Sequence, residues 1–312
     1  MRICAAADIH YPRFGTEWAR ALARGICEAE PDVVILAGDV SAGPDYRYRQ
    51  FLGMFETCGC PKLFVPGNHD LWSDAEEPDT PWRYSEGLRK LVEDCDFHYL
   101  PGDPLALGDV GFAGTIGWWD YAYRQIEPPY DGLRVIPLAA RVEEEATKLV
   151  TIPGRILVPW EELTETDYDG KALVWQDRDG AQQSIIWNDV VHVDWGMPDA
   201  DVARRCADEL AADLASLGPD VSTILGVTHF VPFADLLTGH QSDVQAAYCR
   251  AFMGSPLLGE TLERDPRTRL VICGHQHRQH VTQRGEMVLA DCGVARNNDG
   301  PLLLTLPEVQ PR

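Results

Sequence analysis

The strongest constraint on the fold is a series of short, β-rich apolar runs, each of which ends in a cluster of polar residues. Stretches with helical spacing at 17–30 and 46–57 separate the first three runs. This alternation of strand and helix predicts βαβ crossovers and a largely parallel sheet, and the ligands of such folds bind where the strands end. The five runs are Arg2 to Ala7, Asp32 to Ala37, Lys62 to Pro66, Thr223 to Val227 and Arg269 to Cys273.

The pattern changes between residues 118 and 198, where aromatic, proline and acidic residues replace the regular alternation. We predict that this cap segment (residues 118–198) is an insertion that covers the site. Within it, a charged stretch at 139–149 indicates a helix and a run at 173–187 indicates a hairpin. Helical spacing resumes at 199–217, and residues 281–306 indicate short strands that close a second sheet.

Length and composition indicate one large α/β domain that spans residues 1–312. The chain is 45% hydrophobic and 24% charged, and no apolar run is long enough to cross a bilayer, so we expect a soluble protein. The first apolar run reaches a carboxylate at Asp8, too early for the core of a signal peptide. The nine cysteines are scattered without the even spacing of a disulfide framework. We therefore predict a cytoplasmic protein, with most thiols packed in the core.

The formal net charge of -22 argues against binding to nucleic acid or to an anionic membrane. Such binding requires clustered lysine and arginine side chains that displace counterions. The composition therefore favours a small-molecule substrate and makes no prediction about the oligomeric state.

Residues of the types that bind metals, namely Asp, Asn and His, follow the apolar runs. The first run ends in Asp8-Ile9-His10, and the alternation of an extended chain points the Asp8 and His10 side chains to the same side. Oxygen and nitrogen donors without a thiolate suit a pair of divalent ions, with Mn²⁺ favoured and Fe or Zn²⁺ as alternatives, rather than a cysteine-rich structural zinc site. The later runs lead into Gly38-Asp39, Gly67-Asn68-His69-Asp70, Thr228-His229 and Gly274-His275-Gln276-His277.

In this order, the blocks D-x-H, G-D, G-N-H-D, H and G-H-x-H resemble those of the calcineurin-like metallophosphoesterases. The resemblance covers about residues 1–115 and 220–300. It implies a four-layer α-β-β-α sandwich with two mixed sheets and an inserted lid region. It also implies a metal-dependent phosphoesterase that cleaves a small phosphate mono- or diester, including a nucleotide-derived one, with a hydroxide that bridges two metal ions.

The resemblance also implies a role for individual residues. His69 would donate a hydrogen bond to the phosphoryl group and a proton to the leaving oxygen, and Asp70 would orient its ring. The implied ligands are Asp8, His10 and His277 for one metal, Asn68, His229 and His275 for the other, and Asp39 as the bridge between them.

Several alternatives stay open at this point. The second block continues as Val40-Ser41-Ala42 rather than as the G-D-x-x-D-R-G of protein phosphatases, which favours the branch that contains small-molecule and cyclic-nucleotide phosphodiesterases. The runner-up is a nuclease similar to the recombination-repair exonucleases, which share the G-H-x-H block but which the acidic charge disfavours. A metal-binding scaffold with weak catalysis is an alternative from another class. The remaining histidines, His98, His192, His240 and His280, are expected to have surface or structural roles.

Overall fold

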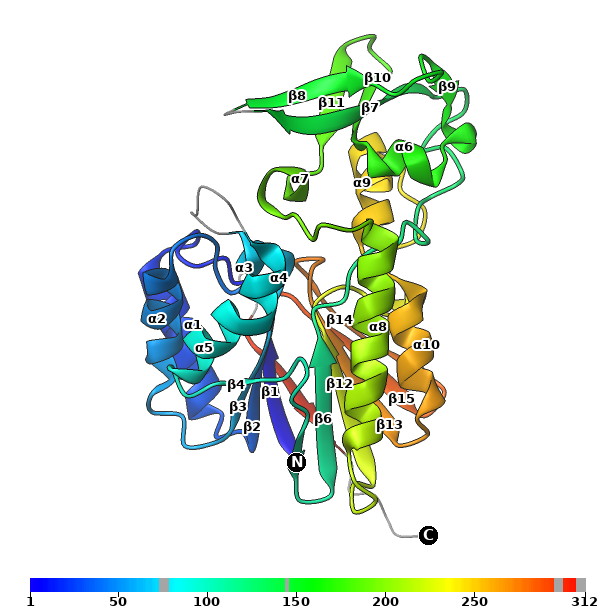
Figure 1. Ribbon diagram of the computed structural model, residues 1–312. Helices are drawn as coiled ribbons and strands as arrows, with labels where there is room; N and C mark the ends of the chain where they lie inside the picture. The colour runs from blue at the N-terminus through cyan, green and yellow to red at the C-terminus, as the bar shows by residue number, and fades with distance from the viewer. Residues whose placement is uncertain (73–78, 144–145, 295–299, 307–312) are drawn as a thin grey trace.

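Two sheets packed face to face form the centre of the molecule (Figure 1). The computed structural model describes residues 1–72, 79–143, 146–294 and 300–306. In the first sheet, β1 to β4 are parallel, and β16 is antiparallel to β1. Its spatial order is β16 (Leu302–Thr305), β1 (Arg2–Ala6), β2 (Val33–Ala37), β3 (Lys62–Val65) and β4 (His98–Tyr99).

The second sheet has a parallel centre and two antiparallel edge strands. In both sheets the central strands are buried along their whole length, as β2 and β3 of the first sheet and β12 of the second show. Strands covered on both faces are expected to have such continuous apolar runs. The spatial order is β14 (Gln279–Arg284), β15 (Met287–Cys292), β13 (Thr268–Cys273), β12 (Thr223–Thr228), β6 (Val110–Thr115) and β5 (Leu105–Leu107).

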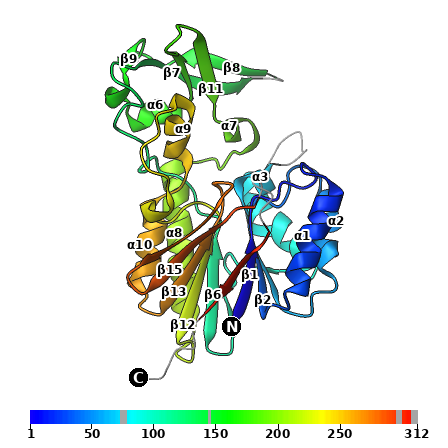
Figure 2. The ribbon, with the colours of Figure 1, turned by 180° about the vertical axis from the view of Figure 1, so that it is seen from behind.

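Helices cover the outer face of each sheet and complete the four layers, which confirms the predicted fold class (Figures 1 and 2). On the first sheet lie α1 (Thr16–Glu28), α2 (Asp45–Leu52) and α5 (Leu88–Glu93), and on the second lie α8 (Asp199–Ser216) and α10 (Pro256–Arg264). α1 buries Ala19, Leu22, Ala23 and Ile26, one apolar stripe at helical spacing, against β1 and β2. Short elements connect these layers: η1 (Gly53–Phe55), α3 (Asn68–Leu71), α4 (Thr80–Trp82), η2 (Arg83–Gly87) and η4 (Ala234–Leu236).

A third, antiparallel sheet lies beyond the carboxyl ends of the central strands and falls within the cap segment (Figure 1). The predicted hairpin at 173–187 is confirmed by β10 (Lys171–Gln176) and β11 (Gln182–Ile186). The insertion of this segment into a single domain stays an interpretation of the sequence. The other elements here are β7 (Arg134–Glu143), β8 (Ala146–Thr151), β9 (Val158–Pro159), η3 (Trp160–Glu162), α6 (Glu165–Asp169) and α7 (Asp189–His192), with α9 (Val244–Cys249) and η5 (Arg250–Phe252) beside them.

Two sequence predictions about secondary structure are wrong. The stretch at 139–149 is not a helix, because β7 pairs with β8 through partners such as Ala140 with Leu149 and Val142 with Thr147. The spacing of its charges suits a helix, but its β-branched residues pair across strands instead. The tail also divides between the sheets. β14 and β15 belong to the second sheet as predicted, whereas β16 joins the first sheet beside β1.

The prediction for the cysteines needs one correction. Cys27 of α1 and Cys58 form a disulfide between positions 31 residues apart, a pairing that their spacing did not indicate. Cys4, Cys206, Cys273 and Cys292 are buried thiols, as expected for core packing. Among the described residues, no helix combines the length and apolar character needed to cross a membrane.

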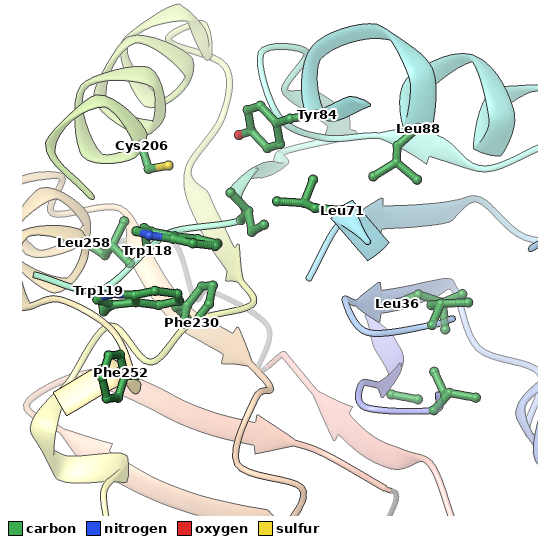
Figure 3. Close-up of a cluster of buried hydrophobic side chains, with 14 of the residues drawn as sticks. Leu36, Leu71, Tyr84, Leu88, Trp118, Trp119, Cys206, Phe230, Phe252 and Leu258 are labelled. Atoms are coloured by element: carbon green, nitrogen blue, oxygen red, sulfur yellow. The ribbon is translucent and has the colours of Figure 1, made fainter. Parts of the chain in front are cut away.

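A buried polar network at the start of α8 connects the cap segment to the second sheet's helical layer. The Asp199 carboxylate accepts hydrogen bonds from Trp118 Nε1 at 2.7 Å and Tyr121 Oη at 2.5 Å, and it lies 2.7 Å from Lys171 Nζ. Trp118 itself stacks on Trp119 with ring centroids 4.1 Å apart, inside the apolar cluster shown in Figure 3. These two tryptophans are therefore packing residues.

We expect Asp199→Ala to lower the free energy of unfolding by about 3 kcal/mol, because three donors would lose their buried acceptor. Urea unfolding followed by tryptophan fluorescence measures this change. Asp201→Ala is the matched control, since Asp201 is exposed in the same helical turn. Equal stabilities of the two variants would contradict a supporting role for the network.

Candidate metal centre

The carboxyl ends of five central strands converge where the two sheets meet, and all seven predicted ligands lie in the turns that follow them. Asp8 and His10 follow β1, and Asp39 follows β2. Asn68 begins α3 after β3, and His229 follows β12. The turn after β13 carries His275 and His277. Chain segments up to 269 residues apart thus bring their donors to one place.

The donors form two groups that share one carboxylate. Asp8, His10, Asp39 and His277 make the first group, and Asp39, His229 and His275 make the second; within each, the ligand atoms lie within 4.8 Å of one another. Asp39 Oδ2 is 3.7 Å from His10 Nε2, and Asp39 Oδ1 is 3.4 Å from His229 Nε2. Asn68 Oδ1 adds an oxygen to the second group, 3.1 Å from His229 Nε2. This arrangement has the connectivity of a dinuclear metal site.

Several buried atoms of the centre have the character of metal ligands. Asp39 Oδ2 and His275 Nε2 are buried and have no hydrogen-bond partner among the described residues. His10 Nε2 and His277 Nε2 face each other at 3.3 Å. His229 Nδ1 lies 2.9 Å from the Ala37 carbonyl oxygen, so Nδ1 carries a proton, and Nε2 points toward Asp39. These nitrogen and oxygen donors fit a pair of divalent ions.

The backbone of the centre is strained. Asp8, His10, Asp39, His275 and His277 all have positive φ angles, between 47° and 74°. This left-handed conformation is unfavourable for residues with a Cβ atom and persists only where the surrounding structure imposes it. Each turn therefore directs its side chain into the centre at a cost in conformational energy.

Carboxylates of the centre also hold the turns by accepting backbone hydrogen bonds. The two oxygens of Asp8 accept the N–H groups of His275 at 3.0 Å and His277 at 3.2 Å. Asp39 Oδ1 accepts the N–H of His69 at 2.9 Å. Two of the predicted ligands thus fix the loops that carry other predicted residues, and the bonds of Asp8 join the two sheets.

Asp70 occupies a different position from the one expected. Its carboxylate does not orient the His69 ring; it accepts the N–H groups of Asp39 and Gly67 at 2.8 Å and those of Val40 and Ser41 at 3.1 Å. Burial and the nearby Asp39 raise the pKa of Asp70 to about 6, against the opposing effect of these N–H donors. Asp70 therefore organises the turn that presents Asp39.

Two glycines allow the turns to approach each other. A Cβ atom on Gly67 would lie 2.2 Å from Asp39 Oδ1 and 2.8 Å from His229 Cε1. Gly38 has a φ of 89°, and a Cβ atom there would lie 2.4 Å from His229 Nδ1. Only glycine leaves room at both positions for the side chains of the centre.

The histidines differ in their electrostatic surroundings. Burial lowers the pKa of His10 to about 3 and that of His275 well below its usual range, so both rings are neutral and suited to bind a metal. Burial also lowers the pKa of His229, but Asp39 and Asp8 outweigh it and raise the value to about 9. A positive charge beside the two carboxylates is therefore favourable, as a bound cation would be.

His69 lies at the edge of the centre and is partly exposed. Its Nε2 is 3.9 Å from Asp39 Oδ2, and its ring packs on Trp72 with centroids 3.9 Å apart. The ring of His192 in α7 also stacks on Trp72, with centroids 4.1 Å apart. Asp189, also in α7, was not predicted from the sequence. Its carboxylate accepts hydrogen bonds from Asn68 and Trp72.

No local signal in the sequence marks Asp189, because it lies 121 residues from Asn68 and outside every motif. Burial raises its pKa, while the nearby His69 and the hydrogen bonds from Asn68 and Trp72 lower it.

A cavity of about 590 Å³ opens beside the centre, between α9, β11 and the metal-ligand turns. Asp39, Asn68, His69 and His275 form its floor. The rest of its lining combines apolar and amide side chains with two arginines and two aspartates, among them Ile185, Ile186, Trp187, Leu237, Gln241, Gln245, Met253, Arg250, Arg278, Asp189 and Asp243. A substrate bound there would lie against the predicted ligands.

Comparisons with known proteins bear on the family and the fold of the chain. A model of the calcineurin-like phosphoesterase family matches residues 1–279. The solved structure of phosphopantetheinyl hydrolase from Mycobacterium tuberculosis superposes with a TM-score of 0.62 at 14% identity, over 99% of this chain and 98% of that one. TT1561 of Thermus thermophilus has a TM-score of 0.48 at 13% identity, over 94% and 88% of the two chains. None of the curated proteins matches the sequence. At 14% identity the phosphopantetheinyl hydrolase structure indicates the fold alone.

We expect Asp70→Asn to lower the free energy of unfolding of the metal-free protein by about 3 kcal/mol, because an amide offers one acceptor oxygen and places N–H groups against backbone donors. Urea unfolding in the presence of a chelator measures this. The same variant should retain less metal than the wild type, since Asp39 would lose its fixed position. A stability within 1 kcal/mol of wild type, a margin of roughly one hydrogen bond, would contradict the organising role.

Proposed function

This chain belongs to the calcineurin-like phosphoesterase family and is a metal-dependent phosphoesterase, and from this premise we propose that it hydrolyses a small phosphate mono- or diester at the centre described above. The observation that carries the proposal is the meeting of seven donors from five strand ends in two groups that share Asp39. In this proposal Asp8, His10 and His277 hold one ion, Asn68, His229 and His275 hold the other, and Asp39 bridges them.

A pair of divalent ions supplies an activated water and positive charge for the phosphoryl oxygens. Mn²⁺ is the ion we favour, with Fe or Zn²⁺ as alternatives, because the donor set is nitrogen and oxygen. The protein contributes the fixed geometry. Its carboxylates and rings are already held by backbone hydrogen bonds and packing, so little reorganisation accompanies the reaction.

In this proposal His69 assists the leaving group. It lies on the floor of the cavity, it is partly exposed, and its ring is held on one face by Trp72. A ring nitrogen in this position can donate a hydrogen bond to a phosphoryl oxygen and a proton to the departing alcohol. Its backbone N–H is fixed by Asp39, which keeps it beside the bridge.

The walls of the cavity support an ester whose leaving alcohol is uncharged. Arg250 donates to the backbone carbonyls of Tyr123, Thr238 and Gly239, and Arg278 donates to that of Leu236. Both guanidinium groups thus donate to backbone carbonyls, and the carboxylates of Asp189 and Asp243 line the same cavity. The apolar and amide side chains of the walls favour a leaving group that combines apolar parts with hydrogen-bonding groups.

A metal-resolved screen of esters tests this proposal. We expect the Mn²⁺-loaded protein to cleave p-nitrophenyl phosphate, bis-(p-nitrophenyl) phosphate or a small natural ester such as a phosphopantetheinyl compound, and to cleave nucleoside triphosphates and DNA poorly.

Asp39→Asn should reduce both the metal content and the rate of hydrolysis, because the bridging side chain loses its charge. Preferred cleavage of single-stranded or duplex DNA would favour the nuclease alternative. No cleavage of any ester by fully metal-loaded protein would favour a scaffold.

We expect His69→Ala to slow turnover by roughly 100-fold or more while metal content stays unchanged, because the ring assists the leaving group without belonging to the ligand set. Steady-state kinetics and elemental analysis of the same preparation measure both quantities. His98→Ala is a matched control, since the His98 ring bonds to the Asp103 carbonyl and takes no part in the centre. Loss of metal from His69→Ala would show that the residue is a ligand instead.

A further inference from the structure

We propose that Asp189 of the cap segment is a positioning residue of the metal centre, and that it fixes the Asn68 amide with its oxygen directed toward the second metal. The inference rests on the proposed function only in taking Asn68 as a ligand. It assigns the cap segment a part in building the centre, in addition to the covering role predicted from its sequence.

The contacts of Asp189 are short and buried. Asn68 Nδ2 lies 3.0 Å from both carboxylate oxygens of Asp189, and Trp72 Nε1 lies 2.7 Å from Oδ1. The Asp189 residue is only 3% exposed. Both partners are nitrogen groups that donate, so the carboxylate is an acceptor for two side chains of the segment that follows β3.

This acceptor decides which way the Asn68 amide faces. An amide has a nitrogen that only donates and an oxygen that accepts, and only the oxygen can bind a cation. Because Asp189 receives the nitrogen, the oxygen must point to the opposite side. There Asn68 Oδ1 lies 3.1 Å from His229 Nε2, beside the group formed by Asp39, His229 and His275. Without a pure acceptor behind it, the amide could turn and present its nitrogen to the metal.

The rest of α7 supports this placement. The His192 ring stacks on one face of Trp72 with centroids 4.1 Å apart, and His69 packs on Trp72 at 3.9 Å. α7 and α3 each contain four residues, and neither is long enough to be stable alone. Their mutual contacts therefore hold both, and a displacement of α7 would change the position of a predicted ligand.

Asp189→Asn tests the inference. The new amide has nearly the shape of the carboxylate but can donate to Asn68 Oδ1, which allows the reversed orientation. We expect titration calorimetry with Mn²⁺ to show two sites in the wild type. In the variant, one site should be weaker by about 10- to 100-fold, the usual effect of losing a partner behind a ligand, while the other stays within about threefold. Electron paramagnetic resonance should show uncoupled Mn²⁺ at concentrations that give a coupled pair in the wild type.

Two further variants separate positioning from a general effect on folding. Asp167→Asn alters another buried carboxylate of the cap segment, which bonds to Thr164 and Arg155 and does not contact Asn68, so both metal sites should be retained. Asp189→Glu keeps an acceptor and should lose less affinity than Asp189→Asn, at the same site.

The inference is overturned if both Asp189 variants, folded by circular dichroism, bind two Mn²⁺ ions within threefold of the wild-type affinities. It is also overturned if Asp167→Asn weakens the same site as strongly. Metal binding is measured without substrate, so the result does not depend on hydrolysis. A protein that binds two ions as expected but cleaves no ester would contradict the proposed function and would still support this inference.

Discussion

Three buried carboxylates at the junction of the two sheets, those of Asp8, Asp39 and Asp70, are the constraint on which the rest of the structure depends. Each residue is at most 1% exposed, and a buried carboxylate is strongly unfavourable unless hydrogen bonds or positive charges surround it. The protein meets this requirement in two ways. Backbone N–H groups converge on all three side chains, and histidine rings lie against Asp8 and Asp39.

This arrangement couples the fold to the centre. The turns that supply N–H donors adopt left-handed conformations at five predicted ligands, and glycine at positions 38 and 67 makes room for them. Their strain is offset by the apolar core between the sheets, which fixes the strand ends from which the turns start. A rigid layered core is thus what permits an unfavourable local geometry to persist at its edge. Ions that bind only the folded form would stabilise it further by mass action.

The cap segment adds chemistry that the central sheets do not provide. β11 and α7 supply one side of the cavity, and the buried network around Asp199 connects the segment to α8. In our proposals this part of the chain both selects the leaving group and holds a ligand in place. Changes in it would then alter substrate choice and metal affinity together, because one short helix borders both sites.

The sequence by itself determined the five apolar runs that form central strands and the set of side chains that follow them, whereas the four-layer class was implied by the resemblance of its motifs to a known family. These follow from local patterns, since apolar runs, glycine turns and motif spacing are properties of neighbouring residues. Asn68, His69 and Asp70 are an example, because their block predicted their location even though the contacts of Asp70 differ from the expected ones.

Only the tertiary structure decided the features that depend on residues distant in the chain. The place of β16 beside β1, the disulfide between Cys27 and Cys58, and the contact of Asp189 with Asn68 all belong to this class. Each joins segments whose local patterns permit more than one partner, and burial in the folded chain selects among them. The physical reason is that a side chain's surroundings are set by which surfaces pack together, and no window of sequence contains that information.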